Sequence, residues 1–357
     1  MKTAIIGLPM VGKTSLFTIL TGVHQETRIG STAVRTGVAR VPDARLDELA
    51  RIFEPPKITH AVVEYLDMPA ISKESLRDPS YLASLRVVDA FAQVLRLFED
   101  QTVPHEKGSV DPVRDLEDIE MELILSDLVV IEKRLERLDK DRKKIKNPEL
   151  DREFELLQQC KAELEADRPL RQMTFDADQE KRMRGFQFLS QKPMLYVLNL
   201  GEESAGKLHE LEQQYREGAL AGRAHTAVTA VCGKIEAELA ELAPEEQRDY
   251  LASYGLEESG LERMVSATYS LLGLMSFLTA GETEVRAWTI PMESTAVKAA
   301  GAIHSDFEKK FIRAEVVNWK ALVDLNGYPG VREKGLLRLE GKEYIVKDGD
   351  VLVIRHS

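Results

Sequence analysis

The sequence predicts an α/β protein made of a parallel-sheet domain, an α-helical hairpin inserted into it and a small mixed α+β domain at the carboxyl end. An apolar run at Thr3–Ile6 leads through a glycine loop into a helix-like segment, Thr14–Leu20, as in the first strand, loop and helix of an α/β fold. A polar stretch at 115–165 carries an apolar seam with helical spacing, and strand-like runs dominate after about residue 278. We therefore expect domain boundaries at 1–112, 113–188, 189–277 and 278–357, with the first and third ranges forming one domain.

Composition excludes several classes of protein. The chain has 357 residues and a net charge of −12, so a nucleic acid or anionic membrane partner would have to meet a locally basic patch. Cys160 and Cys232 are the two cysteines, which leaves neither a disulfide framework nor a thiolate metal site. No apolar stretch is long enough to span a bilayer, and residues 1–7 run straight into a strand without room for a signal peptide. We expect a soluble, cytoplasmic protein.

Three further strand-like runs, in the first and third of these ranges, support a parallel sheet. Val62–Leu66 ends at Asp67, and Met194–Leu198 ends at Asn199, with Val94–Phe98 between them. The carboxyl ends of parallel strands meet at one edge of a sheet, where a ligand crevice forms. The polar residues at these strand ends are therefore candidates for a binding site.

Residues 7–14, GLPMVGKT, fit the phosphate-binding pattern G-x-x-x-x-G-K-[ST] and lie between a strand and a helix. Glycines let backbone N–H groups surround phosphate oxygens, while Lys13 reaches the β and γ phosphates and the Thr14 hydroxyl ligates Mg²⁺. The positive end of the following helix points at the same phosphates. This P-loop predicts nucleotide contacts from Gly7, Pro9, Met10, Val11, Gly12, Lys13, Thr14 and Ser15.

Asp67 stands at the end of an apolar strand, where a P-loop NTPase needs a carboxylate to hold its magnesium ion. An Asp in this position alone is more typical of a turn. Together with the P-loop, it predicts that Thr14 and Asp67 bind Mg²⁺.

The polar stretch predicts two helices packed as a hairpin. Apolar residues between 124 and 145 recur in steps of four and three, and the pattern resumes after Asn147 and Pro148, which form a good N-cap and first-turn pair. An ordinary amphipathic subdomain is the alternative to a projecting coiled-coil arm. A cluster of cations at the tip either meets RNA phosphates or forms a solvated helical face. These cations are Lys140, Arg142, Lys143, Lys144 and Lys146, and they outnumber Asp139 and Asp141.

After residue 278 the periodicity changes to that of strands, with a helix-like segment at Thr295–Ile303 and a turn at Asp348–Gly349. A small α+β domain follows from this pattern. The expected strands are Val285–Ile290, Phe311–Val317, Glu343–Val346 and Val351–Ile354.

With these motifs the sequence resembles the YchF, or Obg-like ATPase, family of translation-associated P-loop NTPases along essentially its whole length. The most specific segments are TAG at 279–281, EVRAWTIP at 284–291 and YIVKDGD at 344–350, beside NLGE at 199–202. The resemblance implies a P-loop NTPase G domain interrupted by an α-helical coiled-coil hairpin and followed by a C-terminal β-grasp (TGS) domain. It also implies ribosome association through the hairpin and the TGS domain.

The resemblance further implies that ATP is preferred over GTP. GTPases read guanine with Asn-Lys-x-Asp, whereas NLGE is similar to the family's Asn-x-x-Glu. A glutamate can still accept hydrogen bonds from guanine, and Asn199 can pair with adenine as amides do elsewhere, so a GTPase of the same fold stays an alternative. The implied base contacts are Asn199, Leu200, Glu202, Val231, Cys232 and Gly233, with Cys232 expected to be a small packing residue.

Two departures from the family affect hydrolysis and its activation. Asp67-Met68-Pro69-Ala70 stands where relatives carry Asp-x-x-Gly, and Ala70 keeps the N–H that meets the γ-phosphate but has a narrower range of φ and ψ. Met10 replaces an Asn that helps potassium-activated relatives hold a monovalent cation, so we expect no strong stimulation by potassium.

Two residues carry over from the family by position. Ser31 aligns with a magnesium-binding Thr, and Thr32 is adjacent. His105 matches a loop histidine that is a candidate for orienting water, although a loop histidine is more often solvated. We accordingly expect Lys13 and His105 to be catalytic in a slow Mg²⁺-dependent ATPase switch that binds ribosomes. The alternative from another class is a hydrolysis-deficient, nucleotide-regulated ribosome or RNA adaptor.

Overall fold

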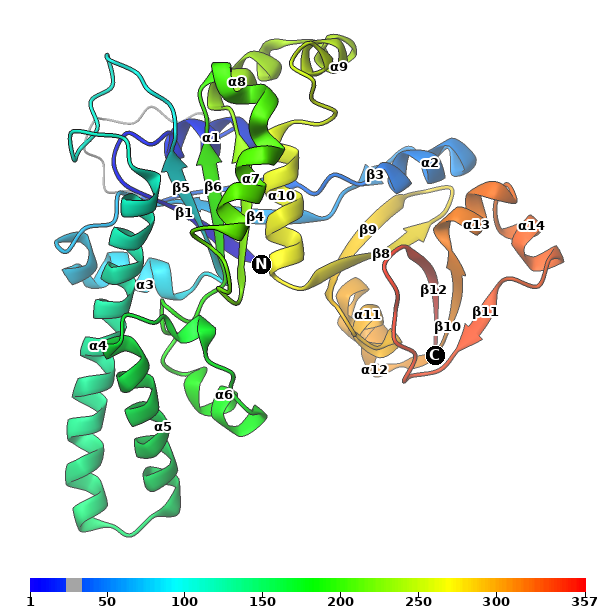
Figure 1. Ribbon diagram of the computed structural model, residues 1–357. Helices are drawn as coiled ribbons and strands as arrows, with labels where there is room; N and C mark the ends of the chain where they lie inside the picture. The colour runs from blue at the N-terminus through cyan, green and yellow to red at the C-terminus, as the bar shows by residue number, and fades with distance from the viewer. Residues whose placement is uncertain (24–33) are drawn as a thin grey trace. The chain divides into compact units, whose positions relative to one another are not determined.

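The computed structural model describes residues 1–23 and 34–357, and the chain divides into two compact units (Figure 1). The first unit contains Met1–Gly37 and Glu64–Ala267, and the second contains Val38–Val63 and Thr268–Ser357.

The first unit is built on a six-stranded sheet with the order β2-β4-β1-β5-β6-β7. Neighbouring strands from β4 to β7 pair in parallel. Every residue of β5 and β6 is buried, as expected for central strands of a parallel sheet covered by helices on both faces. The strands are β1 (Lys2–Ile6), β2 (Arg35–Arg40), β4 (Val62–Asp67), β5 (Ala90–Arg96), β6 (Met194–Asn199) and β7 (Thr226–Val231).

Helices of the first unit flank this sheet and form the insertion (Figure 1). The α-helices are α1 (Lys13–Thr21), α3 (Pro79–Arg86), α4 (Pro112–Lys144), α5 (Pro148–Glu165), α6 (Ala177–Met183), α7 (Leu208–Glu217), α8 (Gly233–Glu241) and α9 (Pro244–Ser253), and α10 (Gly260–Leu271) leads into the second unit. The short 3₁₀ helices are η1 (Ser75–Arg77), η2 (Leu170–Gln172) and η3 (Glu202–Lys207).

The predicted hairpin is formed by α4 and α5, which project from the sheet domain (Figure 1). Asp111 caps α4 by accepting from Arg114 N, and Asn147 caps α5 by accepting from Glu149 N. Side chains of both helices share one buried cluster, so packing rather than helix propensity stabilises the hairpin. The cluster includes Ile124, Ile131 and Leu138 of α4 and Leu156, Leu157, Cys160 and Leu164 of α5.

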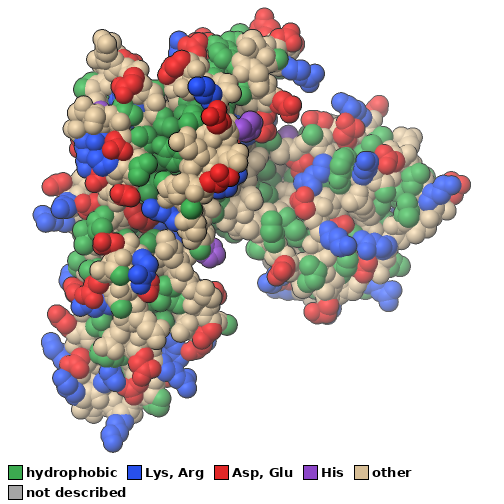
Figure 2. Space-filling view, in the orientation of Figure 1, with side chains coloured by type: hydrophobic (Ala, Val, Ile, Leu, Met, Phe, Trp, Pro, Cys, Tyr) green, Lys and Arg blue, Asp and Glu red, His purple; other side chains and the backbone are tan. Residues whose placement is uncertain are grey.

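Figure 2 shows basic and acidic side chains interspersed at the tip of the hairpin. Arg142 pairs with Asp151, and Lys143 Nζ lies 2.6 Å from Asp139 Oδ2. Part of the predicted basic cluster is therefore neutralised within the hairpin.

The second unit contains a six-stranded mixed sheet with the order β11-β10-β12-β8-β9-β3. β8 and β9 form an antiparallel pair, as do β10 and β12, whereas β12 runs parallel to β8. Helix α11 packs on one face around Phe277, Ile290 and Leu352. The elements are α2 (Ala44–Phe53), β3 (Ile58–Thr59), β8 (Leu274–Ala280), β9 (Val285–Pro291), α11 (Ala296–Ile303), α12 (Ser305–Lys309), β10 (Phe311–Asn318), α13 (Trp319–Asp324), α14 (Tyr328–Glu333), β11 (Arg338–Glu340) and β12 (Asp350–His356).

Residues 38–63 lie with the carboxyl-terminal sheet, whereas we expected them in the first part of the G domain, 1–112. Thr59 Oγ1 donates to Glu284 Oε1 at 2.6 Å, and Arg45 Nη1 donates to Asp348 Oδ2 at 2.7 Å. These contacts join residues far apart in the chain, and local sequence patterns carry no information about them.

The predicted fold class is confirmed, and three strand assignments need correction. β5 begins at Ala90 rather than Val94, because Ala90 pairs with Thr3 of β1. The stretch Glu343–Val346 contributes one isolated bridge instead of a strand; there Asp350 Oδ2 accepts from Tyr344 Oη and Lys347 N and shapes a turn. Strand β8 was not predicted. It is an apolar run that follows α10 almost directly, with Gly273 as the one turn residue between them. Across the described residues, no helix has the length and apolar character needed to cross a membrane.

Candidate nucleotide-binding site

The predicted P-loop joins β1 to α1 in a conformation that needs glycine at both ends. Gly7 and Gly12 have φ angles of +152° and +98°, and Met10 between them is at +61°. A Cβ added to Gly7 would lie 2.8 Å from Val94 O, and one added to Gly12 would lie 2.4 Å from Asn199 Nδ2. Both glycines therefore allow a close approach that any side chain would block.

Lys13 is buried in the loop that it follows. Its Nζ donates to Gly7 O at 3.0 Å and to Leu8 O at 2.6 Å. Burial lowers the pKa of Lys13 to about 8, although the charges of Asp67 and Glu106 raise it. The ammonium group is thus held by loop carbonyls at the place where the motif requires it to meet phosphate oxygens.

Thr14 and Asp67, the two described residues predicted to bind Mg²⁺, meet at the carboxyl edge of the sheet. Thr14 Oγ1 donates to Asp67 Oδ2 at 2.9 Å, and Arg35 of β2 pairs with the same oxygen. Asp67 Oδ1 is buried without a hydrogen-bond partner among the described residues. A buried, unpartnered carboxylate oxygen beside a hydroxyl fits a hard divalent cation that takes its other ligands from phosphates and water. Ser31, the third predicted metal ligand, lies outside the described residues.

Asn199 connects the P-loop to the second half of the sheet. Its Nδ2 donates to Val11 O at 2.9 Å, and its Oδ1 accepts from Gly233 N at 3.1 Å. Beside it, Leu200 N donates to Val231 O at 2.8 Å. Each end of the Asn199 amide is thus bonded to the protein backbone. The amide keeps one donor hydrogen and one acceptor lone pair, so pairing of Asn199 with adenine stays a prediction beside this positioning role.

Glu202 follows β6 and Cys232 follows β7, at the carboxyl edge of the sheet. Lys234 pairs with one oxygen of Glu202, and Tyr254 Oη donates to the other at 2.8 Å. These hydrogen bonds, with that from Lys234 the stronger, hold the pKa of Glu202 below its usual value. Burial raises the pKa of the Cys232 thiol, in keeping with a packing residue.

His105 is directed at helix α4 rather than at the P-loop. Its Nε2 lies 2.9 Å from Asp115 Oδ2, and its Nδ1 accepts from Lys107 N at 3.1 Å. The side chain is 4% exposed, and Arg114 donates to the other oxygen of Asp115. In this arrangement His105 anchors its loop, because both ring nitrogens have protein partners, and it is not placed to orient water.

A cavity of about 320 Å³ opens beside the P-loop. The loop after β5 closes one side of it with Phe98 and Val103, and neither residue was predicted. Phe98 follows a strand of the parallel sheet, so the rule that identified Asp67 would also have found it. Arg35 had no such signal, because its partner is distant in sequence. The other lining residues are Met10, Gly12, Lys13, Thr14 and Ser15, while Pro9 and Val11 contribute to the loop without lining the cavity.

The segment after Asp67 is held on both sides. Met68 N donates to Ile5 O at 3.2 Å, and Tyr81 Oη donates to Pro69 O at 2.9 Å. Ile71 is buried. Contacts with β1 and α3 therefore hold this segment, in which the ring of Pro69 also restricts the backbone.

A parallel sheet with a glycine loop, a buried lysine and a Thr–Asp pair at its carboxyl edge defines a P-loop nucleotide-binding protein. The family model YchF-GTPase_C, described as "Protein of unknown function (DUF933)", matches residues 274–357. The chain belongs to the YchF family. Over its full length it is 39% identical to "Ribosome-binding ATPase YchF" of Bacillus subtilis, with 99% of that protein covered.

Other relatives agree with this assignment. The protein of the same name from Haemophilus ducreyi is 40% identical, with 100% of this chain and 99% of the relative covered. The one from Escherichia coli O157:H7 is 39% identical, with 98% of each covered. The solved structure of the Schizosaccharomyces pombe YchF GTPase superposes with a TM-score of 0.85 at 27% identity, covering 99% of this chain and 97% of that one. The resemblance inferred from the sequence is thereby confirmed.

Proposed function

We propose that this protein is a cytoplasmic, Mg²⁺-dependent ATPase that hydrolyses ATP slowly and binds ribosomes. The P-loop, in which buried Lys13 is held by the carbonyls of Gly7 and Leu8, is the observation that carries the proposal. The relatives named ribosome-binding ATPases support the choice of nucleotide and partner.

Phosphate positioning and charge neutralisation supply the chemistry in this proposal. Lys13 and the loop N–H groups, with the start of α1, bind the phosphates, and Thr14 and Asp67 hold the metal ion, together with Ser31. When bound, Mg²⁺ neutralises charge on the β and γ phosphates. No covalent intermediate is required, and the segments near Ser31 and Asp67 respond to the γ-phosphate.

Glu202, one of the residues expected to contact the base, favours adenine over guanine. Guanine is read by a carboxylate that accepts two hydrogen bonds, whereas both oxygens of Glu202 already accept from Lys234 and Tyr254. Titration of ATP against GTP separates the ATPase from a GTPase of the same fold.

The phosphate site is tested by Lys13→Ala. We expect most ATP binding to be lost in isothermal titration, because the buried ammonium is removed and a buried gap is left. Thr18→Ala is the matched control on the same helix, since Thr18 does not line the cavity beside the P-loop. Unchanged ATP affinity in Lys13→Ala would refute the site.

The tip of the helical hairpin is the proposed ribosome contact. Lys140, Lys144 and Lys146 form no ion pair with any described residue, unlike Arg142 and Lys143. We expect charge reversal of these three lysines to reduce co-sedimentation with ribosomes and to lessen its salt dependence. Co-sedimentation that persists unchanged would exclude the tip as the contact.

A nucleotide-regulated adaptor without useful hydrolysis is the second candidate. It is favoured by the pairing of Arg35 with Asp67, by Ala70 and by the engagement of His105 with Asp115. A catalytic role for His105 requires its ring to leave Asp115. Single-turnover hydrolysis with and without ribosomes, for the wild type and His105→Ala, separates the two candidates.

A further inference from the structure

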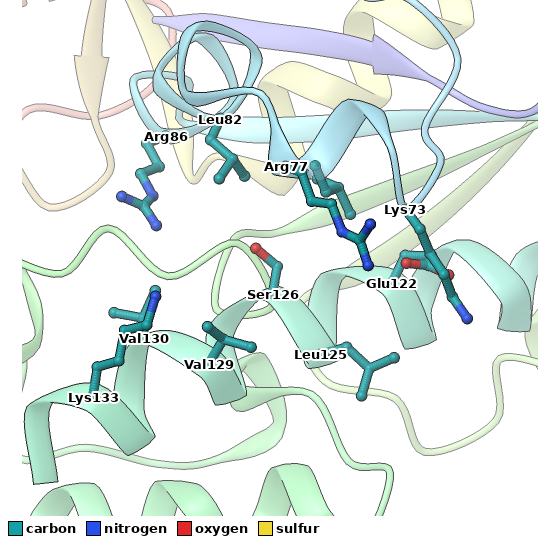
Figure 3. A pocket seen from close by; sticks show the side chains of 11 residues that line it. Lys73, Arg77, Leu82, Arg86, Glu122, Leu125, Ser126, Val129, Val130 and Lys133 are labelled. Atoms are coloured by element: carbon teal, nitrogen blue, oxygen red, sulfur yellow. The ribbon is translucent and has the colours of Figure 1, made fainter. Parts of the chain in front are cut away.

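A groove of about 530 Å³ runs between α4 on one side and η1 and α3 on the other, away from the P-loop (Figure 3). Its floor is aliphatic. Leu125 and Val129, one turn apart on α4, are 40% and 49% exposed, although the opposite face of α4 is buried in the hairpin. Leu76 and Leu82 face them from η1 and α3. Neighbouring exposed aliphatic side chains in a hollow are typical of an interaction site.

Four cations surround this floor. Lys73, Arg77 and Arg86 come from the η1–α3 side and Lys133 from α4, against one carboxylate, Glu122 (Figure 3). None of the four forms an ion pair with any residue in 1–23 or 34–357. Hydrogen bonds lower the pKa of exposed Glu74, and the charges of Arg77 and Lys73 lower it further. The chain as a whole has a net charge of −12. This cluster of cations without ion pairs therefore makes the groove locally positive on a negatively charged protein.

The aliphatic floor and the cations that form its rim together indicate which kind of molecule binds in the groove. RNA would neutralise the cations, but single-stranded RNA binds through aromatic stacking platforms, and no aromatic side chain lines this groove. A helix with leucine-like anchors on one face and carboxylates beside them would satisfy both the floor and the rim, as in other helix-in-groove complexes. We propose that the groove is the docking site for an acidic amphipathic helix of a partner protein.

Chain connectivity and hydrogen bonds link the groove to the nucleotide site. η1 and α3 follow Asp67 in the chain, and Tyr81 of α3 donates to Pro69 O at 2.9 Å. Met68 N in turn donates to Ile5 O, next to the P-loop. We expect Mg²⁺ and ATP to change the affinity of the groove for its helix, an expectation that rests on the proposed function.

The probe for the test is a synthetic, fluorescein-labelled helical peptide with leucines at i and i+4 flanked by glutamates. Binding to the full-length protein is followed by fluorescence anisotropy. We expect Leu125→Glu or Lys133→Glu to weaken binding by about tenfold or more, and replacement of the peptide's glutamates by glutamine to have a similar effect. Ile145→Glu and Lys140→Glu, exposed positions of the same helical hairpin outside the groove, are matched controls that should bind as the wild type does.

Three results would overturn the docking site. They are equal binding of the peptide to the groove variants and the wild type, equal binding of the glutamine peptide, and binding of a single-stranded RNA oligomer that Leu125→Glu abolishes. Circular dichroism and ATP titration of each variant separate these results from misfolding. Equal peptide affinity with and without Mg²⁺ and ATP would overturn the coupling, whereas loss of ATP binding by the wild type would overturn the proposed function instead.

Discussion

The guanidinium of Arg35 pairs with Asp67 Oδ2, the same carboxylate oxygen that accepts from Thr14 Oγ1. The two paired side chains are 7% and 6% exposed. Arg35 also lies over the ring of Phe17, with its guanidinium carbon 5.5 Å from the ring centroid. The ion pair with Asp67 and the contact with the Phe17 ring therefore hold the positive charge of Arg35 at the carboxylate proposed to bind Mg²⁺.

Substitution Arg35→Gln should remove the ion pair and leave the Asp67 carboxylate available to the metal ion. Breaking one partner of a buried pair leaves an uncompensated charge and costs about 3–5 kcal/mol, so the nucleotide-free variant should be less stable by about that amount. Mg²⁺ with nucleotide should then restore more stability than in the wild type and bind more tightly, because no guanidinium competes for Asp67. Thermal unfolding during Mg²⁺ titration measures both effects. Arg40→Gln, an exposed arginine of the same strand, is the control, and an unchanged Mg²⁺ requirement in Arg35→Gln would contradict competition.

Substitution Asn199→Ala should weaken ATP and GTP binding alike. The side chain bridges Val11 O and Gly233 N, and two buried backbone groups left unpaired cost about 1–3 kcal/mol each. Because the bridge positions the P-loop rather than the base, both nucleotides should lose affinity by the same factor in isothermal titration. Asn199→Asp retains the acceptor for Gly233 N but places a carboxylate oxygen against Val11 O, so it should lose at least as much. A selective loss of ATP affinity would instead assign Asn199 to base recognition.

Substitution Lys234→Ala should shift nucleotide preference toward GTP. Lys234 occupies one oxygen of Glu202, and its removal leaves that oxygen free to accept from guanine. The ratio of GTP to ATP affinity should rise by several-fold, about 1 kcal/mol in the difference of binding free energies. Lys207→Ala removes an equal charge from the neighbouring 3₁₀ helix without touching Glu202. No change in the ratio would show that the pairing does not set base preference.

Glu236 should make stability depend on pH. Burial raises the pKa of this α8 carboxyl to about 7, although the backbone N–H of Gly260 donates to it at 2.7 Å. The folded protein therefore binds a proton that the unfolded chain has released, and stability falls as pH rises from about 4.5 to about 7. Glu236→Gln keeps an acceptor for Gly260 and cannot ionise. Across this interval, its stability relative to the wild type should rise by up to about 3 kcal/mol in urea unfolding. A pH-independent difference would show that Glu236 ionises normally.

Several features could be predicted because they depend on neighbours in the chain. The P-loop, Asp67 and the hairpin each follow from spacing that a strand–loop–helix unit or a helical seam imposes locally. The role of His105 could not be predicted this way. Its partner Asp115 was read as part of the helical arm, and only folding brings the two within 2.9 Å.

The amino-acid pattern alone was sufficient for the class of fold, the phosphate loop and the family, since these depend on backbone conformation and on residue types at fixed spacing. The tertiary structure decided which groups remain free. Asn199, Glu202 and Asp67 all carry the chemistry expected of them, yet Val11, Lys234 and Arg35 take up part of their hydrogen-bonding capacity, while Asp67 Oδ1 keeps no partner among the described residues. The physical reason is that a buried polar group must find partners, and which partner lies within reach is determined by the packing of segments far apart in the chain.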